Sequence, residues 1–258
     1  MRVRVISLNN PVRLVATLKR LFPQSEVDVQ RGIDVRKVDV SHLHDANLIT
    51  HGAAHVLRNG RKWHHELSSK GAVGLAHANR MALLDRPEEP LLLLEDDAHI
   101  KDEGAFVRAV HMLLDRQHLF DMAVFGVQAN DTQSAAGMPS EWKSIYGMFH
   151  LMHAVLYTPP GRRIIGEYLR AHPLEMQIDS LCGSLARQGT IRAIGTCGIV
   201  VQRTHLSSIQ ESMGSCILCD VNARTPFTVV VALAAAAGLA AVLAVPAGKA
   251  YRRRPCRV

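Results

Sequence analysis

The chain has 258 residues, enough for one large α/β domain or two small ones. Hydrophobic residues make up 48% of it and charged residues 21%, which excludes an intrinsically disordered chain, and five cysteines are too few for a disulfide scaffold. The net charge is +7, but five basic residues and no acidic residue lie in 227–258, so 1–226 holds 25 Lys and Arg against 23 Asp and Glu. The main part of the chain is therefore nearly neutral, and we expect no nucleic-acid partner.

Helical and extended patterns alternate along residues 1–222. In chain order we predict a strand over 3–8, an amphipathic helix over 12–22, an edge strand and its turn over 27–40, a polar loop with one helix over 41–67, a helix over 68–84, a buried strand over 91–94, a helix over 102–114, a strand over 120–126, a long flexible loop over 127–147, a strand over 148–157 and a helix over 159–171. This alternation predicts one α/β domain with a mostly parallel sheet and helices on both faces.

Three adjacent carboxylates carry most of the chemistry. The apolar run Leu91–Leu94 is typical of a strand that is buried on both faces, and it ends in Glu95, Asp96 and Asp97. In open α/β sheets, ligands bind beyond the carboxyl ends of the strands. In an extended chain Glu95 and Asp97 point to one side and Asp96 to the other. A divalent cation such as Mn²⁺ or Mg²⁺ would relieve the repulsion among these groups, whereas a solvated acidic turn is the simpler alternative.

The surrounding motifs resemble those of glycosyltransferase family 25, which includes lipopolysaccharide-type and procollagen-type galactosyltransferases. The resemblance spans 3–210, and it rests on three motifs and on weaker matches at 120–126, Ile178-Asp179 and Gln202…Ser207-Ser208-Ile209. The three motifs are Val5-Ile-Ser-Leu-Asn…Arg13, Gly71-Ala-Val-Gly-Leu-Ala-His77 and Leu92-Leu-Leu-Glu-Asp-Asp97.

This resemblance implies a GT-A-type, Rossmann-like fold over 1–222. It also implies a metal-dependent transfer of a hexose, with galactose or glucose favoured, from a nucleotide-diphosphate sugar to a hydroxyl of a glycan or protein acceptor. The expected donor is a UDP-hexose and the expected cofactor Mn²⁺ or Mg²⁺. Asp97 is the expected direct metal ligand, Glu95 lies beside it or holds a metal-bound water, and Asp96 faces a ribose hydroxyl or the outer shell of the metal.

Three further residues receive expected roles. An acceptor hydroxyl loses its proton as it attacks, and Asp179 is the candidate base, with capping of a helix over 180–187 as its alternative. His77 is expected to contact the nucleotide or the acceptor, unless it is a core or capping histidine. Arg13 is expected near the nucleotide, unless it is a solvated residue on a helix.

The carboxyl-terminal part has a different composition. Residues 227–245 contain no charge, and Thr228 is the only polar side chain among them, which predicts a transmembrane helix, with a buried core helix as the alternative. The basic tail over 246–258 predicts a cytoplasmic end by the positive-inside rule. The apolar run at the amino terminus is too short for a secretory signal, which favours a cytosolic domain instead. We therefore expect a single-pass membrane protein whose catalytic domain has no assigned side.

Two other functions compete with the transferase. The family pattern has Cys and Ser where this chain has Leu75 and Ala76, which is compatible with a noncatalytic binding or scaffold protein on a decayed transferase fold. Clustered aspartates also occur in metal-dependent phosphohydrolases, but the sequence offers no second cluster of His and Asp at short spacing.

Overall fold

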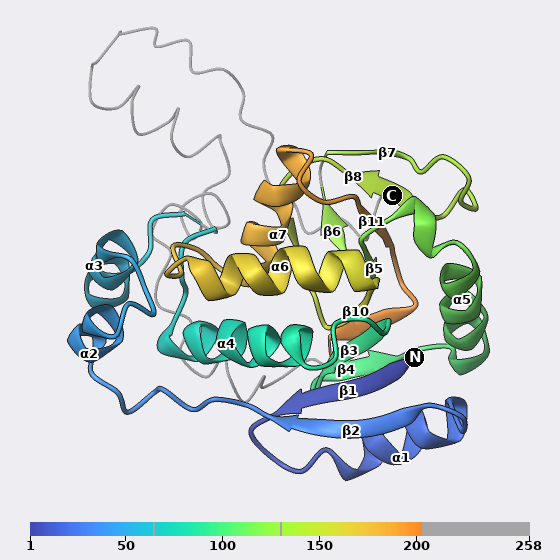
Figure 1. Cartoon of the computed structure of the whole chain (residues 1–258), viewed down its shortest axis with the longest axis horizontal. Helices are drawn as coiled ribbons and strands as arrows, with labels where there is room; N and C mark the ends of the chain where they lie inside the picture. Colours follow the sequence, from blue (N-terminus) through green and yellow to red (C-terminus); the bar gives the residue numbers. More distant parts are fainter. Residues whose placement is uncertain (64, 130, 203–258) are drawn as a thin grey trace, which may run out of the picture.

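An eight-stranded sheet forms the centre of the computed structural model, which describes residues 1–63, 65–129 and 131–202 (Figure 1). The strands follow the order β2-β1-β3-β10-β5-β11-β8-β7 across the sheet. Their bounds in this order are Glu26–Arg31, Arg2–Ser7, Leu91–Glu95, Ala154–Tyr157, Met122–Phe125, Ala193–Thr196, Lys143–Ile145 and Thr132–Ser134. Two small ribbons accompany the sheet and are formed by β4 (Ala98–Ile100) with β12 (Val200–Gln202) and by β6 (Gln128–Ala129) with β9 (Phe149–His150).

The large sheet is mixed. β1 is parallel to β2 and β3, and β5 is parallel to β11, whereas β10 is antiparallel to β3 and β5, and β8 is antiparallel to β11 and β7. All strands of this sheet except β10 and β8 therefore run in one direction. The prediction of an α/β fold with a mostly parallel sheet is confirmed. The prediction did not include the two antiparallel strands, β10 and β8.

Three of the predicted helices begin at residues whose side chains cap them. The side chains of Ser69, Asp102 and Thr158 each accept a hydrogen bond from a backbone N–H three residues further on, at the starts of α4 (Lys70–Leu84), α5 (Glu103–Asp115) and α6 (Pro159–Ala171). α6 also has Pro in its first positions, where a missing N–H has no cost. The other predicted helices are observed as α1 (Val12–Leu21) and α7 (Ile178–Arg187).

Three local expectations are wrong. Residues 41–67 hold two helices rather than one, α2 (Val40–Asp45) and α3 (His51–Asn59), which are capped by Asp39 and Thr50. The expected loop over 127–147 contains the short strands β6, β7 and β8. The expected strand over 148–157 is split into β9 and β10 by Leu151, whose φ of 75° lies in the left-handed region.

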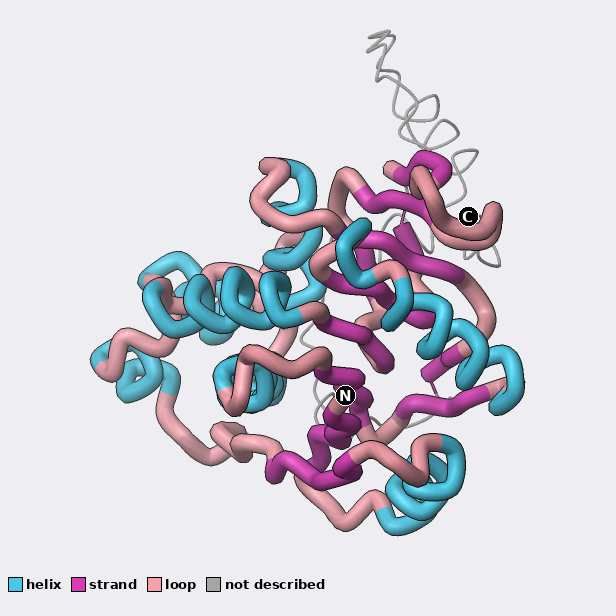
Figure 2. The backbone as a smooth tube through the Cα atoms, turned by 45° about the vertical axis from the view of Figure 1, so that its right-hand side comes forward, coloured by secondary structure: helices cyan, strands magenta, loops and turns pink. Residues whose placement is uncertain are grey.

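The helices cover both faces of the sheet. α4, α6 and α7 pack on one face with Leu91 and Leu93, and α1 and α5 pack on the other face with Leu92 and Leu94 (Figures 1 and 2). Successive side chains of a strand point to opposite faces, so the continuous apolar run over 91–94 supplies both cores. The prediction of a strand buried on both faces is confirmed.

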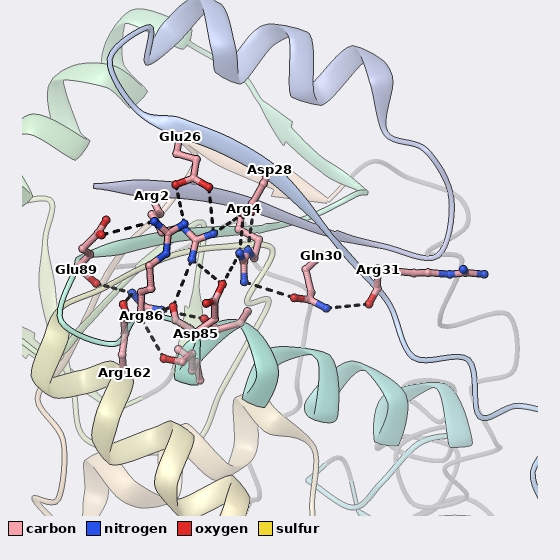
Figure 3. A network of polar contacts seen from close by, with 12 residues as sticks. Arg2, Arg4, Glu26, Asp28, Gln30, Arg31, Asp85, Arg86, Glu89 and Arg162 are labelled. Carbon is pink, nitrogen blue, oxygen red and sulfur yellow. Dashed lines mark hydrogen bonds and ion pairs between the residues drawn. The ribbon is translucent and has the colours of Figure 1, made fainter.

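A network of charged side chains lies at the amino-terminal ends of β1 and β3 (Figure 3). The buried Arg2 and Arg4 form ion pairs with Asp28 and Asp85 at 2.6–2.7 Å. Hydrogen bonds from Arg2 and then Arg4 lower the pKa of Asp85 to about 2, against the effect of burial. This network fixes the edge strand β2 to β1 and to the end of α4.

Arg162 on α6 is fully buried beside this network. Its guanidinium donates hydrogen bonds to backbone carbonyls at the carboxyl-terminal end of α4 and just beyond it, namely those of Ala82, Leu83, Asp85, Arg86 and Glu89. Burial, and then the charges of Arg2 and Arg4, lower its pKa to about 10. Because the last carbonyls of a helix have no partner within it, Arg162 completes the end of α4.

Among the described residues, no helix has both the length and the apolar character needed to cross a membrane. The predicted transmembrane segment over 227–245 and the basic tail over 246–258 lie outside the described residues.

Candidate metal centre and adjacent histidine–aspartate pair

The carboxylate cluster lies where β3 ends, beside the end of β1. The backbone N–H of Glu95 donates to the carbonyl of His153, and that of Asp96 donates to the carbonyl of Ile6. The chain then turns at Asp96 and Asp97 and enters β4. The cluster therefore occupies the edge of the sheet at which α/β folds bind ligands.

Glu95 and Asp97 meet at one histidine. Nδ1 of His153 lies 3.5 Å from Oε2 of Glu95 and 3.3 Å from Oδ1 of Asp97. One ligand atom from each of the three residues can be chosen so that all lie within 4.8 Å of one another. Nε2 of Gln202 donates to the other oxygen of Asp97 at 3.0 Å. The structure thus gathers two of the expected metal ligands and adds His153, which the sequence reasoning missed.

Burial and mutual contact set the charges in this cluster. Burial lowers the pKa of His153, but the contacts with Asp97 and Glu95 outweigh it and raise the pKa to about 10. Burial raises the pKa of Asp97, but the contacts with His153 and Gln202 outweigh it and leave the pKa below its usual value. For Glu95, burial dominates over the contact with His153 and raises the pKa. In the absence of a cation, an imidazolium therefore compensates the carboxylates.

The three residues fit a divalent cation. Carboxylate oxygens are the ligands that Mg²⁺ and Mn²⁺ prefer, and an imidazole nitrogen favours the softer Mn²⁺ over Mg²⁺. Coordination requires a neutral nitrogen on His153, so binding of a cation would release a proton from this site.

Asp96 has a separate environment. Oγ of the buried Ser7 donates to Oδ2 of Asp96 at 2.5 Å, and the backbone N–H of Asn9 donates to the same Oγ at 3.0 Å. These bonds hold the carboxylate of Asp96 at the end of β1. Its expected contact with a ribose hydroxyl or the outer shell of the metal stays a prediction.

Asp179 lies in the first turn of α7 and contacts a second histidine. The N-cap position is Gln177, and Oδ1 of Asp179 accepts a hydrogen bond from the backbone N–H of Ser180 at 2.7 Å. Oδ2 lies 3.4 Å from Nδ1 of His150. The charge of Asp179 contributes to raising the pKa of Glu95, so the pair lies within electrostatic range of the metal cluster. His150 is a second residue that the sequence reasoning missed.

His77 and Arg13 do not bond to the carboxylate cluster in the described structure. His77 is buried in α4, and burial, followed by the charge of Arg80, lowers its pKa to about 4 despite the nearby carbonyl of Leu48. Arg13 is exposed in the first turn of α1. Within the part of the chain that the structure describes, neither residue forms a hydrogen bond or ion pair with Glu95 or Asp97.

Comparisons with known proteins support no family assignment. No protein-family model matches the sequence, and no curated protein sequence matches it. Among solved structures, a UTP-bound UGPase from Acinetobacter baumannii is 11% identical with a TM-score of 0.47, and the alignment covers 93% of this chain and 99% of that one. A UDP-glucose pyrophosphorylase complexed with UDP-glucose is 12% identical with a TM-score of 0.44, with coverage of 76% of this chain and 90% of that one. These likenesses are too distant to carry an argument about function.

Proposed function

We propose that this chain is a metal-dependent glycosyltransferase that moves a hexose from a nucleotide-diphosphate sugar to an acceptor hydroxyl. The observation that carries the proposal is the group of Glu95, Asp97 and His153 at the carboxyl end of β3, in which one ligand atom from each residue lies within 4.8 Å of the other two. The resemblance of the sequence motifs to glycosyltransferase family 25 points to the same chemistry.

Each group in the site has a task in this reaction. Glu95, Asp97 and His153 would hold Mn²⁺ or Mg²⁺, which when bound supplies positive charge for the diphosphate leaving group. Asp96, whose carboxylate accepts a hydrogen bond from Ser7, would accept a second one from a ribose hydroxyl. A UDP-hexose, with galactose or glucose as the sugar, is the donor that the resemblance favours, and a glycan or a protein is the acceptor.

The test is a screen of donor binding and donor hydrolysis by the full chain with Mn²⁺. UDP-galactose and UDP-glucose are compared with GDP- and CMP-linked sugars, and Mn²⁺ is compared with EDTA. We expect Asp97→Asn to reduce Mn²⁺-dependent hydrolysis roughly 10²–10³-fold, because the amide keeps the shape of the side chain but loses its charge. The matched control is Asp115→Asn, which changes an exposed aspartate at the end of α5. Near-normal hydrolysis by Asp97→Asn would rule out the assigned metal site.

A second candidate function is a binding protein on the same fold that uses no metal. The observation that favours it is His153, which as an imidazolium offsets part of the negative charge of Glu95 and Asp97 without a cation. Nucleotide-sugar binding that is equally tight in Mn²⁺ and in EDTA, with no hydrolysis, would support this alternative. Binding that requires Mn²⁺ would support the enzyme.

We also propose that the domain is attached to a membrane through residues 227–245, on the evidence of their sequence alone. Retention of the full chain in the membrane pellet after alkaline carbonate treatment would support this attachment, and extraction would contradict it. Protease protection of a tag at each end of the chain, in sealed microsomes, would assign the side of the catalytic domain.

A further inference from the structure

We propose that His150, rather than Asp179, is the base that takes the proton of the acceptor hydroxyl, and that Asp179 positions its imidazole. This inference rests on the proposed transferase function and adds two roles to that site. It replaces the expectation from the sequence that Asp179 itself is the base.

The first argument is that the two carboxylate oxygens of Asp179 have different partners. Oδ1 accepts hydrogen bonds from the backbone N–H of Ser180 at 2.7 Å and from the Oγ of Ser180 at 3.3 Å. Oδ2 lies 3.4 Å from Nδ1 of His150. A carboxylate that is fixed on one side and faces an imidazole on the other orients the ring and favours the tautomer with its proton on Nδ1. In this tautomer Nε2 is the basic nitrogen.

The second argument is access from solvent. The side chain of His150 is 30% exposed, whereas that of Asp179 is 17% exposed and the side chains of His153 and Asp97 are both 6% exposed. An acceptor arriving from solution therefore reaches the imidazole more readily than the carboxylate. A general base must come within hydrogen-bond reach of the proton that it removes, so access separates the two candidates.

The third argument is the close packing that holds the pair together. α7 packs against β9, and Gly183 lies one helical turn after Asp179 on the same face of α7. A Cβ atom at Gly183 would lie 2.8 Å from the carbonyl oxygen of Gly147 and 3.0 Å from Cα of Met148. Only glycine permits this approach of the helix to the segment that leads into β9, and the approach brings Asp179 next to His150.

The fourth argument is the backbone that links the two histidines of the site. Leu151 has a φ of 75°, which is uncommon for a residue with a side chain, and it ends β9 directly after His150. The chain then reaches His153 in the metal cluster. Backbone held in a sparsely populated region gathers at functional sites because the surrounding structure enforces it. Here the turn at Leu151 separates the two histidines. The imidazole of His150 contacts Asp179, and the imidazole of His153 contacts Glu95 and Asp97.

The step balances as a group transfer. As the acceptor oxygen forms a bond to the anomeric carbon of the sugar, its proton moves to Nε2 of His150. The bond between the anomeric carbon and the diphosphate oxygen breaks, and its electron pair leaves with the nucleotide diphosphate. His150 then returns the proton to solvent.

The experiment uses the full chain with saturating Mn²⁺, and UDP-galactose or UDP-glucose as donor with water as the acceptor. We expect His150→Gln to lower kcat about 10²–10⁴-fold, the usual contribution of general base catalysis, while the KM for the donor and the affinity for the donor in calorimetry change less than about threefold. Asp179→Asn is expected to lower kcat by a smaller factor, on the order of 10–10²-fold, again without weakening donor binding, because the imidazole remains but loses its orientation.

A readout that does not depend on activity accompanies the kinetics. In protein with ¹⁵N-labelled histidine, the resonances of His150 are assigned by their loss in His150→Gln. We expect the tautomer protonated on Nδ1 in the wild type and a mixture of tautomers in Asp179→Asn. The matched control is the pair His44 and Asp45, whose Nδ1 and Oδ1 also lie 3.4 Å apart but on the surface of α2. His44→Gln and Asp45→Asn are expected to leave kcat unchanged.

The possible results separate the two proposals. An unchanged kcat in His150→Gln, or a loss confined to donor affinity, overturns the assignment of the base. If Asp97→Asn is inactive at the same time, the transferase proposal survives. A wild-type chain that neither binds nor hydrolyses any nucleotide sugar with Mn²⁺ overturns both proposals. If His150→Gln melts well below the wild type, His150→Asn is measured in its place.

Discussion

The two ends of β1 and β3 carry charged clusters of opposite character. At the amino-terminal ends, Arg2 and Arg4 meet Asp28 and Asp85 at 2.6–2.7 Å, and cations and anions balance (Figure 3). At the carboxyl-terminal ends, Glu95 and Asp97 share one histidine at 3.3–3.5 Å. Within residues 1–202 as far as the structure describes them, Oδ1 of Asp97 and both ring nitrogens of His153 are buried without a hydrogen-bond partner of ordinary geometry.

This difference separates a structural network from a functional one. Buried polar groups in folded proteins are nearly always hydrogen-bonded, so those that are not require another explanation, such as an ion or a ligand. In the described structure the arginine network pairs each guanidinium with carboxylates and leaves Nε of Arg2 as its one buried atom without a hydrogen-bond partner. The carboxylate cluster has buried atoms without a hydrogen-bond partner that a cation could bind, and its shifted pKa values are typical of a functional site.

The largest effect on stability is expected from Arg162→Met. The change leaves several carbonyls at the end of α4 without a donor in a buried place, and we expect the free energy of unfolding to fall by about 3–5 kcal/mol. Urea denaturation followed by circular dichroism measures it. Arg163→Met is the control, because Arg163 is the next residue on α6 and is exposed. An equal fall in the free energy of unfolding in the two variants would show that the loss of stability does not come from the buried guanidinium.

The next largest effect is a change in melting temperature, which we expect to have opposite signs in variants of the two clusters. Glu95→Gln is expected to lower turnover roughly 10²–10³-fold and to raise the melting temperature of the metal-free chain, because burial disfavours the ionised carboxylate. Asp28→Asn is expected to lower the melting temperature and to leave turnover per folded molecule unchanged, because its ion pairs in the described structure are with Arg2 and Arg4 and not with the metal cluster. Thermal melts in EDTA and rates with Mn²⁺ test both. Stability losses of the same size in both variants would contradict the distinction between a structural and a functional cluster.

A smaller effect concerns pH. The pKa of His153 rises from 6.5 to about 10 on folding, so its contribution to stability is fully present below about pH 6.5 and is lost as the pH rises toward 10. We expect the free energy of unfolding in EDTA to decline over this window, and His153→Gln to flatten the decline. Urea denaturation at a series of pH values measures the slope. An identical slope in the wild type and in His153→Gln would contradict the assigned pKa.

Mn²⁺ provides the mildest perturbation. A ligand that binds only the folded chain stabilises it, by about 2.7 kcal/mol at a concentration of 100 Kd. We expect Mn²⁺ to raise the melting temperature of the wild type, to raise that of Asp97→Asn less, and to act on Asp28→Asn as on the wild type. A shift in Asp97→Asn that equals that of the wild type would place the ion elsewhere.

The local features of this chain could be predicted from the sequence. Ser69, Asp102 and Thr158 cap helices through hydrogen bonds to residues three positions further along the chain. The apolar run over 91–94 predicts a strand that is buried on both faces, whatever its neighbours in the sheet. The carboxylates at Glu95, Asp96 and Asp97 followed from the end of that run, since capping, periodicity and strand ends depend on residues close together in the chain.

The partners of those carboxylates were decided by tertiary structure. His153 meets Glu95 because β10 pairs with β3 in an antiparallel register, and nothing near either residue in the sequence specifies that pairing. His150 meets Asp179 because α7 approaches the segment before β9 at Gly183. Capping and periodicity act over a few residues, whereas both of these contacts depend on how distant segments pack.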